Sequence, residues 1–282
     1  MALTVNTNTT SLNVQKNLNR ASDALSTSMT RLSSGLKINS AKDDAAGLQI
    51  ATRMTSQIRG QTMAIKNAND GISMAQTAEG AMQEQTNILQ RMRELAIQSR
   101  NDSNSATDRV ALNKEFSQMS DELTRIANST NLNGKNLLDG TASTMTFQVG
   151  SNTGADNQIS LTLSASFDAT SLGVGSTVTI LGSDSAAAET AFSAAMDAIT
   201  SAIDTINSAR ADLGAAQNRF SSTISNLQNI NENASAALGR VQDTDFAAET
   251  AQLTKQQTLQ QASTSVLAQA NQLPSAVLKL LQ

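Results

Sequence analysis

Apolar residues recur along this chain at alternating intervals of four and three positions, the heptad spacing of helices that pack side by side. The first stripe runs from Val14 to Leu32, with the polar Ser28 as its weak point. A heptad stripe covers only a narrow face of a helix. It therefore predicts pairing with another helix rather than a thick core.

Four further stripes follow the first. One starts near Ile58 and predicts a long helix that ends near Arg100, where a polar segment supplies a turn and a new helix start. The next stripe covers residues 112–126. In the far half, a heptad register over residues 199–241 predicts a helix of about 50 residues. A last stripe covers residues 259–280.

The middle of the chain has a different period. TMTFQVG, QISLTLSAS and STVTILG, all within residues 141–182, alternate polar and apolar residues and are bounded by Gly, Asn and Asp. This pattern predicts short β-hairpins. The sequence thus predicts a mainly α fold, a long antiparallel helical coiled coil or bundle built from both chain ends, with a small central β-hairpin region.

The composition excludes most chemistry. The 282 residues include no His and no Cys, which removes thiolate nucleophiles, imidazole acid–base catalysis and the usual zinc sites. A net charge of -4 without a basic run argues against a nucleic-acid partner. No apolar run approaches the roughly 18 residues of a membrane span, and the start lacks the features of a secretory signal peptide. We expect no enzyme activity, no cofactor, no metal and no membrane partner.

Residues 31–54 contain features that could be mistaken for an active site. A Ser-x-x-Lys pair begins at Ser34, and two carboxylates are adjacent at Asp43 and Asp44. The other motifs of serine acyl-enzymes are absent, and neighbouring side chains diverge by about 100° on a helix, which does not suit a shared proton. Ser40 and Asp43 instead predict a capping box for the helix that follows.

Two long stretches carry a resemblance to a known family. The chain opens with MALTVNTNTTSLNVQKNLNRASDALSTSMTRLSSGLKINSAKDDAAGLQIATRM and closes with DTDFAAETAQLTKQQTLQQASTSVLAQANQLPSAVLKLL. These stretches resemble the two terminal regions of bacterial flagellin, and the likeness covers about residues 1–140 and 190–282. The middle resembles that of short flagellins, and residues 30–51 are most similar to flagellins of plant-associated pseudomonads.

The resemblance implies a structural subunit that self-assembles into the extracellular flagellar filament used for swimming. It implies an inner-core helix at residues 1–42, an outer helical domain at 43–140 and 185–242, a solvent-facing β excursion at 141–184 and an inner-core helix at 243–282. We expect the polar-rich chain ends to order only on assembly. The inner-core assembly residues would be Val14, Leu18, Leu25, Leu32, Leu259, Val266, Leu273, Val277 and Leu280.

The resemblance also implies partners. These are further copies of the chain, a cap protein, a hook-filament junction protein, an export chaperone, the flagellar type III secretion apparatus and host pattern-recognition receptors. Residues 30–51 match a peptide sensed by a plant receptor kinase, with Asp43 and Asp44 facing the receptor and Gly47 and Leu48 near the co-receptor. Residues 89–99 resemble the segment bound by Toll-like receptor 5, with matches at Arg91, Glu94, Leu95 and, on the next helix, Glu115.

The region from residue 141 to 201 is dense in Ser and Thr and is predicted to be outermost. Such a surface suits O-linked glycans. The candidate hydroxyls are Ser143, Ser151, Ser160, Ser164, Ser166, Ser171, Ser176, Ser183, Ser185, Ser193 and Ser201. A mass of native filaments equal to the sequence mass would reject this hypothesis.

Three alternatives compete with the filament subunit. A hook-filament junction protein has similar terminal helices, but it would resemble flagellin less closely at both ends. An enzyme carried in a central insert would need a domain-sized insert, and the motif His-Glu-x-x-His of zinc proteases requires His. A soluble coiled-coil adaptor would form defined oligomers and no polymer.

Overall fold

A computed structural model describes residues 7–280 of the chain, and side chains are described for residues 7–272. The chain divides into two compact units. Unit 1 contains the described parts of residues 1–58 and 232–282, and unit 2 contains residues 59–231.

Helices account for most of the described chain, as the heptad stripes predict. They are α1 (Thr9–Ser34), α2 (Ala45–Arg100), α3 (Ala106–Ser129), α4 (Ser185–Gln242) and α5 (Phe246–Leu280). Two antiparallel strand pairs accompany them, β1 (Asn131–Leu132) with β2 (Lys135–Asn136) and β3 (Ser143–Gln148) with β4 (Gln158–Leu163). A short 3-10 helix, η1 (Ala155–Asn157), precedes β4. The predicted mainly α fold with a small central β region is confirmed.

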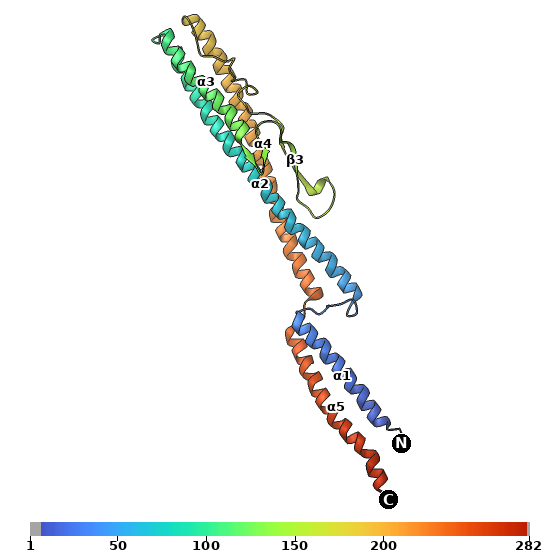
Figure 1. Cartoon of the computed structure of the whole chain (residues 1–282). Coiled ribbons are helices and arrows are strands. Elements are labelled where there is room, and N and C mark those ends of the chain that lie inside the picture. The colour runs from blue at the N-terminus through green and yellow to red at the C-terminus, as the bar shows by residue number, and fades with distance from the viewer. Residues whose placement is uncertain (1–6, 281–282) are drawn as a thin grey trace. The chain divides into compact units, whose positions relative to one another are not determined.

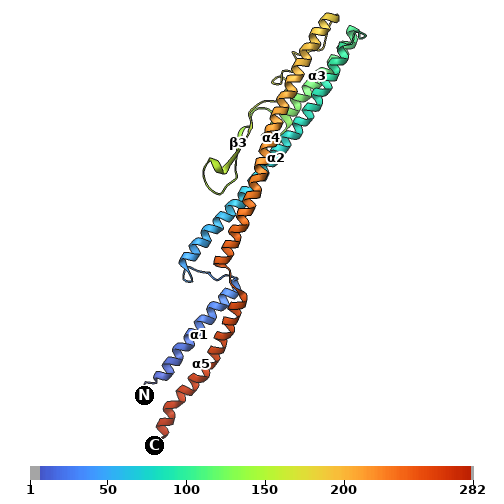
Figure 2. The ribbon, with the colours of Figure 1, turned by 180° about the vertical axis from the view of Figure 1, so that it is seen from behind.

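In unit 1, α1 lies beside α5, and both views of the ribbon show the pair (Figures 1 and 2). Asn8 caps the start of α1, and its side chain accepts a hydrogen bond from the Ser11 N–H. Gly35 caps the end of the helix in the left-handed conformation, with φ of 74°. Between these ends, the buried residues of α1 are Ala21 and Ser28. The predicted weak point of the stripe is therefore one of its most enclosed positions.

In unit 2, α2, α3 and α4 lie side by side (Figures 1 and 2). A capping box formed by Ser105 and Asp108 starts α3. The buried Gln85 side chain donates to the carbonyls of Leu123 on α3 and Phe167 in the central region. The largest fully buried side chains are Phe116, Phe220, Met82, Leu89, Met92, Leu95, Leu123, Leu137, Leu138, Ile180, Ile199 and Ile206.

The longer hairpin contributes to this core through one face. Met145, Ile159, Leu161 and Leu163 are buried, as the predicted alternation requires. Beside them, the half-buried Phe147 ring meets the Phe220 ring of α4 edge to face, with centroids 5.4 Å apart.

The shorter hairpin was not predicted. Asn133 and Gly134 have φ values of 52° and 76°, and an Asn-Gly pair with two positive φ angles is the preferred two-residue hairpin turn. That dipeptide was the signal in the sequence that could have identified β1 and β2.

The third predicted strand is wrong. Residues 176–182 form no strand, although their polar and apolar residues alternate. Their main-chain groups bond to helix side chains instead: the Ile180 N–H donates to Asn113 at 2.9 Å, and the Ile180 carbonyl accepts from the Ser99 hydroxyl at 2.7 Å. Because Ile180 finds these partners and is buried, the segment needs no strand neighbour.

The predicted capping box at Ser40 and Asp43 is also wrong. α2 begins at Ala45, and the residue that caps it is Asp44, whose carboxylate accepts from the Gly47 N–H at 2.9 Å. Ser40 and Asp43 close a separate turn before the helix, in which the Asp43 N–H donates to the Ser40 carbonyl.

A glycine pair on α2 gives a test of the packing. At Gly71 a Cβ atom would lie 2.6 Å from the Phe220 ring, whereas at Gly80 no atom lies within 4 Å. Both glycine-to-alanine changes gain about 1 kcal/mol of helix propensity, but Gly71→Ala also overpacks the core at a cost of about 1–3 kcal/mol. We expect Gly80→Ala to raise the thermal midpoint of the monomer. The midpoint of Gly71→Ala should lie below that of Gly80→Ala, because only Gly71→Ala carries the cost of overpacking. Equal midpoints would contradict the packing of Phe220 on α2.

Candidate functional site

The predicted inner-core residues whose side chains are described are not enclosed by the α1–α5 pair. On α1 they are only half-buried: Val14, Leu18, Leu25 and Leu32. On α5, Leu259 and Val266 are exposed. The positions Leu273, Val277 and Leu280 lie outside the residues whose side chains are described. Two helices alone therefore leave much of each heptad stripe in contact with water.

Further apolar side chains of unit 1 are exposed outside the stripe. Leu12, Met29 and Phe246 are among the large exposed hydrophobic residues. The sequence prediction missed them because they lie outside the heptad positions. Exposed large apolar side chains on paired helices are candidates for an interaction surface.

Among residues 7–272, a few side-chain contacts join α1 to α5, one of them a hydrogen bond that Ser11 donates to Asn271 at 2.8 Å. The Asn8 side chain donates to the Ala270 carbonyl at 2.7 Å, and Arg31 pairs with Glu249 at 3.7 Å. An ion pair in contact with solvent contributes about 0–1 kcal/mol. These contacts fix the register of the two helices more than they stabilise the pair.

A connector joins α1 to α2 and runs beside the break between α4 and α5. The Lys37 N–H donates to the Gln242 carbonyl at 2.7 Å, and the Thr244 N–H donates to the Gly35 carbonyl at 2.9 Å. These two hydrogen bonds connect the segment that follows α1 to the segment between α4 and α5.

The Ser34 hydroxyl, at the end of α1, binds groups of the connector. It accepts from the Leu36 N–H at 3.1 Å and from the Asn39 side chain at 2.8 Å. Within residues 7–272, no cluster of three or more His, Cys, Asp or Glu side chains could hold a metal ion. Within the described helices, none is long and apolar enough to cross a membrane.

The two adjacent carboxylates of the connector have different roles. The Asp43 carboxylate accepts from the N–H groups of Asn39 and Ser40, at 3.1 and 2.9 Å, and from the Ser40 hydroxyl at 3.0 Å. These donors, the Ser40 N–H foremost, lower the pKa of Asp43 below its ordinary value of 3.8. Asp44 caps α2 through the Gly47 N–H.

The two residues predicted to lie near the plant co-receptor are less exposed than Asp43 and Asp44. Gly47 is buried, and a Cβ there would lie 2.6 Å from the Ile38 side chain. Leu48 is half-buried. The structure therefore exposes Asp43 and Asp44 and encloses Gly47.

The residues predicted to contact Toll-like receptor 5 also differ in their exposure to solvent. The Arg91 guanidinium bridges two carboxylates, donating to Glu115 of α3 at 2.9 Å and to Glu94 at 2.9 Å. The hydrogen bond to Glu115, and then that to Glu94, raises the pKa of Arg91. Arg91 and Glu94 are exposed, whereas Leu95 is fully buried in the core of unit 2. Leu95 thus supports the surface formed by the other three residues without being part of it.

The serine candidates for glycosylation are mostly accessible. Ser166 is half-buried, and its hydroxyl donates to Asp168 at 3.1 Å; the Ser185 hydroxyl donates to Asp102 at 2.9 Å. The remaining candidates are exposed: Ser143, Ser151, Ser160, Ser164, Ser171, Ser176, Ser183, Ser193 and Ser201. Their glycosylation stays a prediction.

The fold and these surfaces define a class, a helical structural protein whose paired chain ends leave apolar side chains exposed. The sequence matches the family model of the bacterial flagellin N-terminal helical region over residues 5–143 and that of the C-terminal helical region over residues 196–281. The chain belongs to the bacterial flagellin family, and it is a structural subunit of the flagellar filament.

Curated relatives match over their full length. Flagellin B of Vibrio anguillarum is 42% identical, and polar flagellin A of Vibrio parahaemolyticus is 40% identical, each over 100% of both chains. A solved structure of a flagellar hook-associated protein from Vibrio parahaemolyticus has a TM-score of 0.60 at 14% identity, covering 71% of this chain and 100% of that one. This last likeness shows a shared fold alone, so the full-length flagellin identities decide between filament subunit and junction protein.

The turn at Asp43 gives a pH-dependent prediction. Because the pKa of Asp43 is depressed in the folded chain, its contribution to stability is present above the unfolded pKa and is lost as the pH falls through the folded pKa. A carboxyl NMR titration of Ser40→Ala should show the pKa of Asp43 raised part of the way to 3.8, since the backbone donors remain. Ser33→Ala, a change on the exposed surface of α1, should leave it unchanged. An unaltered Asp43 titration in Ser40→Ala would refute the arrangement.

Proposed function

We propose that this flagellin polymerises through its paired chain ends, with the apolar faces of α1 and α5 buried against the same helices of neighbouring copies. The observation that carries the proposal is the exposure of Met29, Phe246 and Val266 on helices that already pair. Burying a large apolar side chain contributes about 1.5–3 kcal/mol. Several such side chains per subunit offset the entropy lost when the ends become ordered.

We also propose a route to the filament. The chain passes unfolded through the flagellar type III secretion apparatus with the help of an export chaperone. It then adds beneath a cap protein, to a filament that starts at a hook-filament junction protein outside the cell. The absence of Cys supports this route, because no disulfide hinders threading of the chain. Without His or Cys the chain also lacks the common catalytic groups, and we propose that it performs no catalysis.

Recognition by host receptors is a second proposed role. The Arg91, Glu94 and Glu115 side chains offer an exposed charged surface on α2 and α3, which supports contact with an animal receptor of the Toll-like receptor 5 type. In the connector, Asp43 and Asp44 are exposed and Gly47 is enclosed. A plant receptor that contacts Gly47 would therefore need this segment to leave the folded subunit.

Assembly through the chain ends can be tested by substituting a methionine on α1 and, as a control, an equally exposed valine on α3. Met29 on α1 is 58% exposed, and Val110 on α3 is 59% exposed. Met29→Gln should raise the critical concentration for polymerisation about fivefold, because about 1 kcal/mol of apolar burial is lost at each contact. Val110→Gln should leave it unchanged. The quantity to measure is the protein left in the supernatant after filaments are sedimented.

Equal critical concentrations for the two variants and the unaltered protein would contradict assembly through the ends. Equal thermal midpoints of the monomers would show that neither change acts through folding.

Substitutions at Arg91 and Leu95 distinguish an effect on receptor recognition from an effect on folding. Arg91→Ala removes an exposed ion-pair group at a cost of about 0–1 kcal/mol, so we expect a folded, filament-forming protein that activates the receptor less. Leu95→Ala opens a cavity in the core at a cost of about 2–5 kcal/mol, so loss of activation should accompany a lower thermal midpoint. Reporter cells and thermal unfolding measure the two effects. Full activation by Arg91→Ala would exclude this surface as the receptor contact.

A further inference from the structure

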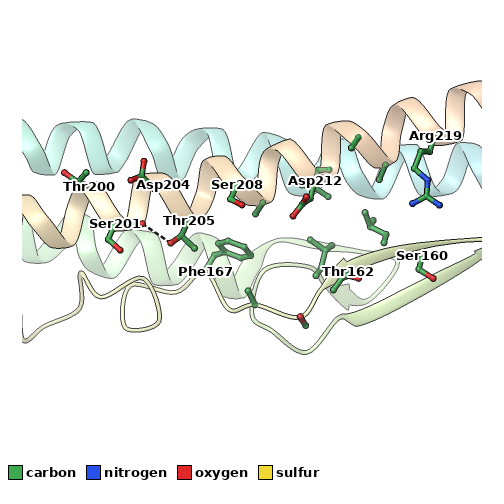
Figure 3. A pocket seen from close by; sticks show the side chains of 18 of the residues that line it. Ser160, Thr162, Phe167, Thr200, Ser201, Asp204, Thr205, Ser208, Asp212 and Arg219 are labelled. Carbon is green, nitrogen blue, oxygen red and sulfur yellow. Dashed lines mark hydrogen bonds between the residues drawn. The ribbon is translucent and has the colours of Figure 1, made fainter.

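A groove of about 1050 Å³ lies in unit 2 between α4 and the segment that begins with β4 (Figure 3). Its lining includes apolar side chains that are themselves buried, namely Leu161, Leu163, Phe167 and Leu213. Serine and threonine hydroxyls, such as Ser160 and Thr205, lie along its edges. The groove therefore has an apolar floor and polar walls, an arrangement typical of a docking surface.

One wall carries a row of carboxylates. Asp197, Asp204 and Asp212 line the groove from α4 and are exposed, and Figure 3 shows Asp204 and Asp212 on either side of Ser208. Within residues 7–272, no ion pair or hydrogen bond reaches these three carboxylates. At 1.5 Å per helical residue, successive members stand about 10.5 and 12 Å apart along the axis.

This spacing indicates an extended partner rather than a bound ion. Carboxylates about 10 Å apart on a helix cannot share one cation, whose oxygen ligands must all lie within about 2.6 Å of it. Arg219 also lines the groove from α4, but no ion pair within the described residues joins it to these three carboxylates. The row therefore favours a partner with cationic groups at matching intervals.

The chain itself carries such a partner on the exposed face of α2. Arg59 and Lys66 are exposed, seven residues apart, and so stand about 10.5 Å apart along the helix axis. Between them lies Met63, a large apolar side chain that is 54% exposed. No ion pair within the described residues involves Arg59 or Lys66. The face thus has two cations 7 residues apart, close to the 7- and 8-residue intervals of the carboxylates, and a large apolar side chain between them.

We propose that the Arg59–Met63–Lys66 face of one subunit docks in the α4–β4 groove of a second copy. Arg59 and Lys66 pair with two successive carboxylates of the row, and Met63 packs on the apolar floor between them. The proposal rests on the proposed function, and it identifies two surfaces of unit 2 that meet in the polymer. Because the two surfaces differ, the contact is heterologous, and repetition of such a contact generates an open helical array.

Charge reversal tests the pairing. The double variant Asp204→Lys/Asp212→Lys should raise the critical concentration for polymerisation about tenfold or more, because like charges then meet in the groove. Adding Arg59→Glu/Lys66→Glu to the same chain should restore it to near the original value. The matched control, Asp121→Lys/Asp156→Lys, makes the same charge change at exposed positions outside the groove and should have no such effect.

Cysteine cross-linking tests the contact itself, since the chain has no natural Cys. Filaments assembled from a mixture of Met63→Cys and Ser208→Cys subunits, one of them mass-labelled, should yield disulfide-linked dimers with one subunit of each kind. Ser208 lines the groove. A mixture of Val110→Cys and Ser208→Cys should yield none.

The outcomes separate this contact from the proposed function. If the unaltered protein polymerises while the charge variants keep the same critical concentration and the Met63–Ser208 mixture gives no cross-link, the docking is overturned and assembly through the chain ends stands. Restored assembly in the fourfold variant, together with mixed dimers, establishes the contact. Failure of the unaltered protein to polymerise would overturn both.

Discussion

Every helix of this flagellin carries an apolar stripe that is too narrow to be satisfied by the helix itself. In unit 2, α2, α3 and α4 share their stripes and enclose Phe116, Phe220 and Leu95 completely. In the described part of unit 1, α1 pairs with α5, and the pair leaves Met29 and Phe246 exposed to water. A helix in a pair has a single neighbour to cover it, and this difference separates a self-sufficient core from a surface that requires further copies.

Polar side chains hold the non-helical segments against the helices of unit 2. The buried Arg109 guanidinium donates to the Gly182 carbonyl at 3.5 Å, and the Asn113 and Ser99 side chains bind the main chain at Ile180. A buried cation is costly unless it is hydrogen-bonded, so Arg109 requires the segment that surrounds it. The central region is thus anchored by side-chain to backbone hydrogen bonds more than by strand pairing.

The surfaces predicted for recognition also serve the fold. Asp43 closes the turn before α2, Asp44 caps that helix, and Arg91 joins α2 to α3. A receptor that contacts these side chains would contact groups that the subunit needs for its own geometry. Substitutions that escape recognition would therefore alter local structure, most strongly at Gly47 and Leu95, which are enclosed.

Heptad spacing determined the long helices and the narrow apolar face of each, because helical period is a local property of the sequence. The absence of His and Cys likewise restricts the chemistry of the chain, whatever fold it adopts. Three features depended on tertiary contacts. Residues 176–182 are not a strand, because Asn113 and Ser99 bind their main chain. Leu95 is buried although Arg91, four residues earlier, is exposed, and the groove between α4 and β4 is lined by residues as far apart in sequence as 160 and 219. Each requires partners distant in sequence, which periodicity alone does not specify.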